Sequence, residues 1–183
     1  MTVISPADPI EMALATRAML EFKGPVYMRT GRSPSKCVFG DDHKFEIGKG
    51  HIVRDGKDVT IVACGVEVAR AVEAAELLAA DGVQSRVVNM ATIKPIDKQL
   101  LIRCAKHTGA FVTAEDHNIL GGLGSAVAES LAATMPCPIE FVGVKDVFGA
   151  SGEPEELAEQ FGLTAPHIAE AARRAIARKK KAK

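Results

Sequence analysis

The side chains best suited to chemistry stand directly before a cluster of glycines. They are Glu115, Asp116 and His117, and the glycines that follow are Gly121, Gly122 and Gly124. A carboxylate beside a histidine is a common general acid/base pair. Glycines before a helix can instead cradle an anion, or they can simply form a closely packed turn between a strand and a helix. These three hypotheses lead to different functions.

The acid/base hypothesis is the weakest of the three. Asp116 and His117 are adjacent, so on an extended segment their side chains point to opposite sides. The sequence contains no G-x-S-x-G motif that would supply a nucleophile. A single histidine at the end of a strand usually makes a structural hydrogen bond. We therefore predict no catalytic residue in this chain.

A dinucleotide site is also disfavoured. When Gly122 and Gly124 are placed at the first two fingerprint positions, Val127 takes the position that requires glycine or alanine. Glu140, at about the right distance for a ribose contact, falls inside a predicted strand instead of at its end. Binding of a simpler anion at the Gly121–Gly124 turn, beside His117, remains open, and so does a role of this turn in a subunit interface.

Two arginines form a second candidate site. Arg29 and Arg32 follow a short predicted strand, with Gly31 between them. Guanidinium groups at the carboxyl end of a strand are good ligands for phosphate. A solvated pair in a loop is an equally good interpretation of the local sequence.

Neither metal binding nor disulfide bonding is predicted. The five histidines are scattered, and the four cysteines lie far apart without a C-x-x-C pair. These cysteines are Cys37, Cys64, Cys104 and Cys137.

Composition and charge narrow the class of protein. The chain has 183 residues, 47% of them hydrophobic, no tryptophan and a formal net charge of zero. The end of the chain is basic, with Arg173, Arg174, Arg178, Lys179, Lys180, Lys181 and Lys183. No aromatic residues interleave with these charges, so we interpret them as cations at a helix C-terminus and predict no nucleic-acid partner. No segment is apolar enough to cross a membrane and no secretory signal is recognisable, which favours a cytoplasmic protein without a membrane partner.

The elements that must position these residues alternate regularly. Continuous apolar runs at 58–65, 83–90, 110–116 and 137–144 predict buried strands, with helices between and after them. This pattern predicts an α/β fold, a three-layer α/β/α sandwich with a mostly parallel sheet. A strand–helix–strand unit precedes it. Its helix opens at Asp8-Pro9 and is expected to turn Ile10, Ala13, Leu14, Ala18 and Leu20 or Met19 inward. We assign residues 1–30 to this incomplete unit, 31–48 to a connector, and 49–183 to the main domain with its basic tail.

Several segments, in order, resemble the transketolase family. "PADPIEMALATRAMLEFKGPVYMRTGR" is similar to the end of its pyrimidine-binding domain, which makes residues 1–30 a remnant of that domain. "DVTIVACGVEVARAVEAAELLAADG", "TAEDHNILGGLGSAVAE" and "VKDVFGASGEPEELAEQFGLTAPHI" resemble its C-terminal domain. The last of these is most similar to split transketolases, which are made as separate N- and C-terminal chains.

The resemblance implies a function for the complete enzyme. It implies thiamine diphosphate with magnesium, transfer of a two-carbon unit between sugar phosphates, and assembly as a homodimer in the pentose phosphate pathway. It also implies a partner, either an N-terminal transketolase chain or further N-terminal domains, because the cofactor-binding regions correspond to nothing in this chain. The chain alone is expected to bind no cofactor and to be inactive. Arg32 takes the position of the arginine that contacts the substrate phosphate, and Arg29 is a weaker candidate. The segment with His117 and the glycines belongs to the C-terminal domain, as scaffold or subunit interface.

Three alternatives remain. Ser151-Gly152 stands where 1-deoxyxylulose-5-phosphate synthases usually have His-Gly, so a fragment of that enzyme is one alternative. A 2-oxoacid dehydrogenase beta subunit is another, although the chain lacks the proline- and tyrosine-rich ending of those subunits. The third is a stand-alone regulatory or assembly module that binds an anion at the Gly121–Gly124 turn.

Overall fold

A five-stranded sheet forms the centre of the molecule. The computed structural model describes residues 1–32 and 34–181, so Lys183 of the basic tail lies outside the described residues. The sheet contains β3 (His51–Arg54), β4 (Val59–Ala63), β5 (Ser85–Asn89), β7 (Phe111–Asn118) and β8 (Ile139–Val144). Their order is β3-β5-β4-β7-β8, and all neighbours are parallel except β3, which runs antiparallel to β5.

The sequence predicted four of these strands and missed β3. All five residues of β4 and all five of β5 are buried, which gives the continuous apolar runs that mark central strands. Strand β3 is a short edge strand with His51 and Ile52 exposed, so it lacks that signature.

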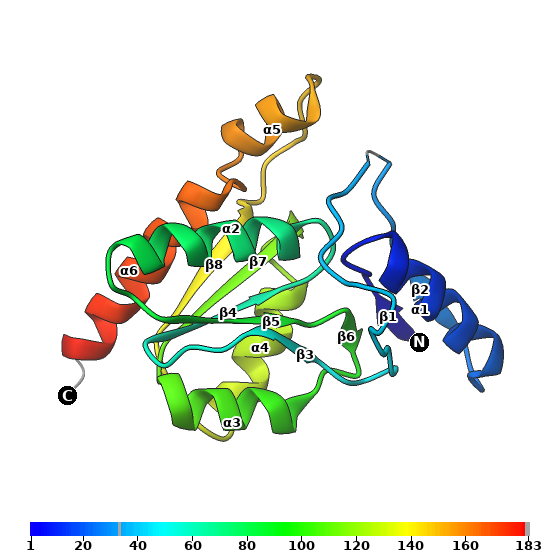
Figure 1. Cartoon of the computed structure of the whole chain (residues 1–183), viewed down its shortest axis with the longest axis horizontal. Helices are drawn as coiled ribbons and strands as arrows, with labels where there is room; N and C mark the ends of the chain where they lie inside the picture. Colours follow the sequence, from blue (N-terminus) through cyan, green and yellow to red (C-terminus); the bar gives the residue numbers. More distant parts are fainter. Residues whose placement is uncertain (33, 182–183) are drawn as a thin grey trace.

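Helices cover both faces of the sheet. Helices α2 (Glu67–Ala80) and α6 (Ala165–Lys181) share one hydrophobic core with the sheet, and α3 (Lys98–Thr108) and α4 (Leu123–Ala132) share a second core on the opposite face. The predicted α/β/α sandwich is thereby confirmed (Figure 1). The short helix α5 (Pro154–Gln160) stands away from the sheet at the edge of the first layer.

A second, smaller sheet lies at one end of the molecule. It consists of β1 (Thr2–Ile4), β2 (Val26–Met28) and β6 (Thr92–Lys94), in the order β2-β1-β6. We call β1, α1 (Pro9–Glu21) and β2 the N-terminal unit; it lies at the end opposite to the C-terminus of α6 (Figure 1). The predicted strand–helix–strand order is confirmed. The sequence did not predict β6, which comes from the main domain and pairs antiparallel with β1.

Helix α1 begins as predicted but buries a partly different face. Asp8 is the N-cap, and its side chain accepts a hydrogen bond from the backbone N–H of Glu11. The predicted inward face is only partly right. Ile10, Leu14, Ala18 and Met19 are half-buried, but Ala13 and Leu20 are exposed, and the fully buried residues are Glu11 and Ala15. Glu11 turns inward because it pairs with polar side chains of two other segments, the connector and β5. The apolar spacing of the helix could not reveal these partners.

The connector is fixed along its course. Residues 31–48 form no helix or strand in the part that the structure describes. The second carboxylate oxygen of Asp8 nevertheless accepts hydrogen bonds from the backbone N–H groups of Val38 and Phe39, both at 2.8 Å. At its far end the N–H of Gly48 donates to the hydroxyl of Thr92 on β6.

The basic end of the chain is helical and bonds to the chain itself. Arg174 and Arg178 form ion pairs with Glu140 on β8, and Lys179 donates a hydrogen bond to the carbonyl of Thr108 at the end of α3. These contacts agree with the interpretation of the tail as a helix C-terminus. Among the described residues, none of the helices has the length and hydropathy needed to span a bilayer.

Candidate functional site

The order of the strands locates a natural binding edge. Strand β4 continues through α2 to β5 on one side, whereas its neighbour β7 continues through α4 to β8 on the other. The chain therefore leaves two adjacent carboxyl ends in opposite directions, and ligands of open α/β sheets bind at such points. Glu115, Asp116 and His117 lie at this edge, on the last part of β7.

Glu115 is bonded to the start of α4. Its two carboxylate oxygens accept hydrogen bonds from the backbone N–H of Leu123 at 2.6 Å and of Gly124 at 2.8 Å. The side chain is fully buried, and this burial raises its pKa, against the lowering effect of the two N–H donors. The carboxylate occupies the place that an anion would take at the N-terminus of a helix.

The three glycines serve three separate purposes. Gly121 has a φ of +77°, which favours glycine. A Cβ on Gly122 would lie 2.0 Å from a carboxylate oxygen of Glu115, so only glycine lets that carboxylate approach the helix. A Cβ on Gly124 would lie 2.6 Å from the ring of Phe141 on β8. The turn is built around the chain's own groups, because Glu115 takes the N–H groups that an anion would bind.

The neighbouring acid and histidine do point to different sides. His117 is half-exposed, and its Nδ1 lies 2.8 Å from the carbonyl oxygen of Asn118 and 4.0 Å from Glu115. His117 lines one cleft and Asp116 lines another. The carbonyl oxygen of Asp116 accepts a hydrogen bond of 2.6 Å from the guanidinium of Arg29.

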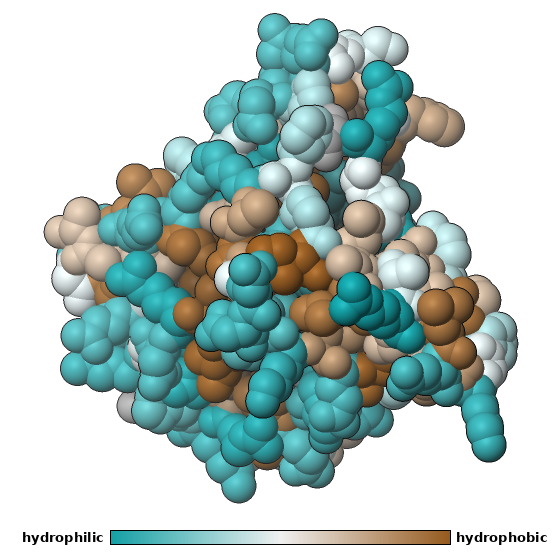
Figure 2. Space-filling model, turned by 45° about the vertical axis from the view of Figure 1, so that its right-hand side comes forward, coloured by the Kyte–Doolittle hydropathy of each residue, from teal (hydrophilic) through white to brown (hydrophobic). Residues whose placement is uncertain are grey.

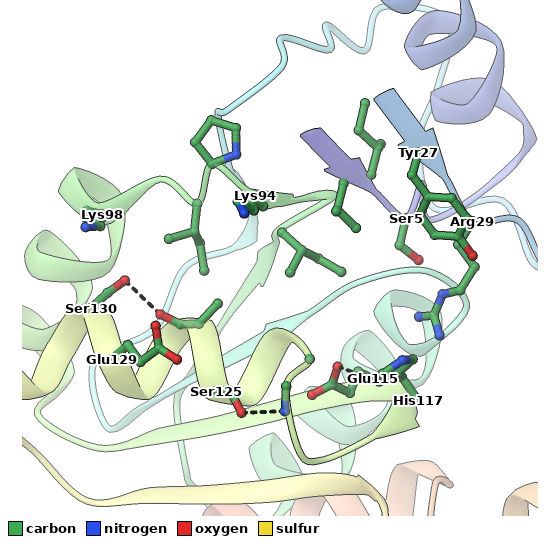
Figure 3. A pocket seen from close by; sticks show the side chains of 18 residues that line it. Ser5, Tyr27, Arg29, Lys94, Lys98, Glu115, His117, Ser125, Glu129 and Ser130 are labelled. Carbon is green, nitrogen blue, oxygen red and sulfur yellow. Dashed lines mark hydrogen bonds and ion pairs between the residues drawn. The ribbon is translucent and has the colours of Figure 1, made fainter. Parts of the chain in front are cut away.

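The larger cleft lies between the N-terminal unit and α4. It has a volume of about 800 Å³ and brings together residues from both candidate sites, Arg29 on one side and His117, Gly121 and Gly122 on the other. Figure 3 shows Arg29 reaching from the end of β2 toward Glu115 and His117, while Lys94 and Lys98 lie at the opposite end. The wall between these cationic ends is largely apolar, with Val3, Ile4, Ile93, Pro95, Ile96 and Ala126.

Arg32 does not share this cleft. It lines a second one of about 770 Å³ between the connector, α2 and α5, together with the acids Glu73, Asp116 and Glu155. The two arginines therefore do not form the fork that their spacing suggested. Arg29 shares its cleft with the carboxylates of Glu115 and Glu129. The cleft of Arg32 contains further cations, Lys36 and Arg70, which form ion pairs with Glu73 and Glu155.

Sequence reasoning missed one buried acid at this edge. Glu67, in the first turn of α2, is fully buried, and one of its oxygens forms an ion pair with Arg70 at 2.6 Å. Its other oxygen has no hydrogen-bond partner among the described residues. Burial raises the pKa of Glu67 to about 7. A glutamate directly after the Cys64-Gly65 turn was the only signal in the sequence.

The described residues do not supply a metal site. Within residues 1–32 and 34–181, no group of three or more histidine, cysteine, aspartate or glutamate side chains converges. The cysteines are free thiols, and burial raises the pKa of Cys64 to about 12, so this thiol is not an activated nucleophile.

Comparisons with known proteins give one consistent result. The family model described as Transketolase, C-terminal domain, matches residues 48–168. The chain is 44% identical over 179 residues to a 6-deoxy-6-sulfo-D-fructose transketolase subunit from Clostridium sp., which covers 98% of this chain and 56% of the relative. It is 42% identical over 172 residues to a putative transketolase C-terminal section from Methanocaldococcus jannaschii, with 92% and 54% covered.

Two further similarities extend the comparison. A 1-deoxy-D-xylulose-5-phosphate synthase from Heliobacterium modesticaldum is 39% identical over 176 residues, which cover 94% of this chain and 27% of that protein. A solved structure described as a split gene transketolase, inactive beta4 tetramer, superposes with a TM-score of 0.95 at 49% identity. It covers 98% of this chain and 59% of its own. The chain thus spans about half the length, or less, of these relatives.

Proposed function

Because the chain belongs to the transketolase family, which generally uses thiamine diphosphate, we propose that it is the C-terminal part of a thiamine-diphosphate-dependent transketolase. In this proposal the complete enzyme moves a two-carbon unit between sugar phosphates. An N-terminal chain, or further N-terminal domains, completes it. The sequence similarity to subunits of split transketolases supports this pairing.

The exposed surface of the N-terminal unit supports the proposal that another chain or domain packs against it. Its sheet contains a parallel pair, β1 and β2, and parallel strands are normally covered on both faces. Helix α1 covers one face, whereas the other opens into the larger cleft, and Leu20, Phe22 and Tyr27 remain exposed. Figure 2 shows hydrophobic residues exposed among hydrophilic ones on the side of the molecule that carries this unit. A further α/β segment beside β2 would bury them.

The cofactor is proposed to bind mainly outside this chain. The described residues do not fit a magnesium diphosphate group, because no cluster of metal ligands is present among them and Glu115 already fills the glycine-rich start of α4. When bound, the cofactor supplies carbanion chemistry. The residues of this chain would contribute the binding of the substrate.

The position of Arg29 carries the substrate proposal. Its backbone is fixed by a hydrogen bond of 2.9 Å to the carbonyl of Ile4, and its side chain is anchored on Asp116 at the edge of the cleft. An arginine held in this way keeps N–H donors for the terminal anion of a sugar phosphate. We propose Arg29 as the first phosphate ligand and keep Arg32 as a second.

The experiment is a kinetic comparison of three arginine variants in the enzyme assembled with an N-terminal transketolase chain. We expect Arg29→Ala to raise KM for the sugar phosphate by roughly ten- to a hundredfold, because a charge-assisted hydrogen bond is lost. Arg32→Ala is expected to have a smaller effect, and Arg103→Ala, an exposed arginine on α3, none. An unchanged KM in Arg29→Ala would remove this residue from the site.

A second activity is favoured by one observation. The similarity to a 1-deoxy-D-xylulose-5-phosphate synthase spans nearly the whole chain at 39% identity. Supplying pyruvate or a ketose phosphate as the donor to the same assembled enzyme separates the two activities. We propose that a ketose and not pyruvate is the donor used, because two relatives described as parts of transketolases share 42–44% identity with this chain.

The assembly of the enzyme is also a proposal. The similar split transketolase structure is described as an inactive tetramer of beta chains. We propose that this chain self-associates when its N-terminal partner is absent and forms the active assembly, around a homodimeric core, when the partner is present.

A further inference from the structure

Three segments that are distant in the sequence meet at one buried carboxylate. Glu11 on α1 accepts hydrogen bonds from the side-chain amide of Asn89 at 2.6 Å and from the backbone N–H of Ala7 at 2.8 Å. The Nε2 of His43, on the connector, lies 3.3 Å from the same carboxylate. Asn89 ends β5, so the group links the N-terminal unit, the connector and the main sheet.

The group is sealed from solvent. The side chains of Glu11 and His43 are each only 2% exposed, and Asn89 is buried. The ring of His43 stacks on Phe39 with centroids 3.6 Å apart and planes 8° apart. His51 on β3 lies beside this stack, edge-on to both rings, with its centroid 5.2 Å from that of His43 and 5.6 Å from that of Phe39. A histidine packed in this way can change its proton count but cannot move into water.

Few charged groups face the pair. Glu11 and Asp8 come from α1 and its cap, His43 comes from the connector, and His51 comes from β3. The carboxylate of Asp8 is already bonded to three backbone N–H groups, those of Glu11, Val38 and Phe39. The balance of charge in the pocket is therefore decided chiefly by Glu11 and His43.

One proton makes this pair neutral. With one proton in total, the pair is either carboxylate with imidazolium or carboxylic acid with imidazole, and neither form buries a net charge. A second proton leaves a buried positive charge, and loss of the first leaves a buried negative charge. Either state is costly in a dry site.

We propose that Glu11 and His43 share one proton and form a clasp that holds the N-terminal unit and the connector on the main domain, and that this clasp loosens when the pair gains or loses a proton. Loosening of the clasp would also change the larger cleft, because β1, β2 and the Arg29 that follows β2 form one of its walls. The clasp thus couples the proton count of a buried pair to the position of that wall. The proposal does not depend on the proposed enzyme activity.

The direction of the pKa of Glu11 is consistent with the alkaline side of this scheme. Burial raises its pKa above the ordinary value, and the hydrogen bonds from Ala7, His43 and Asn89 oppose this only in part. A carboxyl with a raised pKa in the folded state contributes stability that is complete at low pH and is lost as the pH rises through the folded pKa. Burial and the neighbouring His43 lower the pKa of His51, so His51 favours its neutral form beside the pair.

The test is amide hydrogen exchange of Val38 and Phe39 in the whole chain from pH 4 to 9, expressed as protection factors that correct for the intrinsic rate. We expect wild-type protection to have a maximum inside this range and to fall at least fivefold toward each end. In the double variant Glu11→Gln with His43→Gln, which removes both titrating groups, the maximum should vanish. Glu76→Gln with His107→Gln, two exposed residues on α2 and α3, is the matched control and should keep the wild-type profile.

A second measurement needs no variant. The carboxyl carbon signal of Glu11 in the wild-type protein, followed by NMR, should change in two steps, since both protons belong to the pair. A single-step titration, or protection that keeps its maximum in the double variant, would overturn the proposal. This holds even if the double variant proves too unstable to study.

Discussion

At the scale of single residues, Glu115 is a buried polar group that the chain itself satisfies. The carboxylate of Glu115 takes the two N–H groups that the start of α4 would otherwise offer to an anion. This bond explains why a glycine follows the acid seven positions later: Gly122 must lack a side chain so that Glu115 can reach the helix. The pattern that suggested chemistry is therefore one of close packing.

A pair of glycine variants tests this interpretation. Gly122→Ala should lower the free energy of unfolding by about 3 kcal/mol, because the new Cβ collides with the carboxylate and disrupts its two charge-assisted bonds. Gly121→Ala, where a Cβ would meet no atom within 4 Å, should cost only about 1 kcal/mol from its positive φ. Chemical denaturation at neutral pH measures both. Equal losses would show that backbone conformation alone decides the turn.

Glu67 should make the stability depend on pH. Its folded pKa of about 7 lies above the ordinary 4.5, so the native state binds the proton more tightly than the unfolded chain. Stability from this residue is complete below about pH 4.5 and is lost as the pH rises through about 7, by an amount on the order of 3 kcal/mol.

The comparison for Glu67 is with Glu67→Gln, which resembles the neutral acid. Melting temperatures from pH 5 to 8.5 should show the wild type losing stability relative to this variant. A constant difference between the two proteins across that range would mean that Arg70 keeps Glu67 charged throughout.

At the scale of elements, the N-terminal unit depends on contacts that it does not contain. Its sheet has a third strand only because β6, which follows β5 in the chain, pairs with β1. Its helix α1 starts at Asp8, whose second oxygen binds the connector 30 residues later. These contacts join residues 1–48 to the main domain.

Asp8 should therefore matter more than an ordinary helix cap. Asp8→Ala removes the N-cap of α1 and leaves two further N–H groups without an acceptor, so we expect a loss of about 3 kcal/mol in unfolding free energy. Asp97→Ala is the comparison variant: it removes the N-cap of α3 and one longer hydrogen bond, 3.3 Å from the N–H of Gly50, and should cost about 2 kcal/mol. Equal losses, measured by denaturant titration, would contradict a role of Asp8 in fixing the connector.

At the scale of the whole molecule, the chain has the form of a part. A well-covered sandwich is joined to a small sheet with an open face, and the chain spans about half the length of the transketolase subunits that it matches. This form leads to a prediction about competence. Calorimetry of the isolated chain with thiamine diphosphate and magnesium should show no binding, and adding the N-terminal chain should restore it. Tight, magnesium-dependent binding by this chain alone would overturn the proposal that the cofactor contacts lie elsewhere.

The sequence alone was sufficient for the features that depend on neighbours along the chain. Continuous apolar runs marked β4, β5, β7 and β8, and Asp8 and Gly109 marked a helix start and a helix end. Periodicity and capping report local burial and local backbone geometry, so they can be recognised in the sequence without knowledge of the fold. The order of familiar segments also identified the family.

Tertiary structure decided which of the candidate residues meet. Arg29 and Arg32 are three positions apart in the sequence, yet they line different clefts. Arg29 and His117 line the same cleft although they are 88 positions apart. Glu11 was not among the residues expected to face inward, and it meets His43 and Asn89 in a buried pocket. Spacing along a chain fixes only the local direction of a side chain. Its partners follow from the order of the strands in the sheets and from the energetic need to pair every buried polar group, and both are properties of the folded molecule.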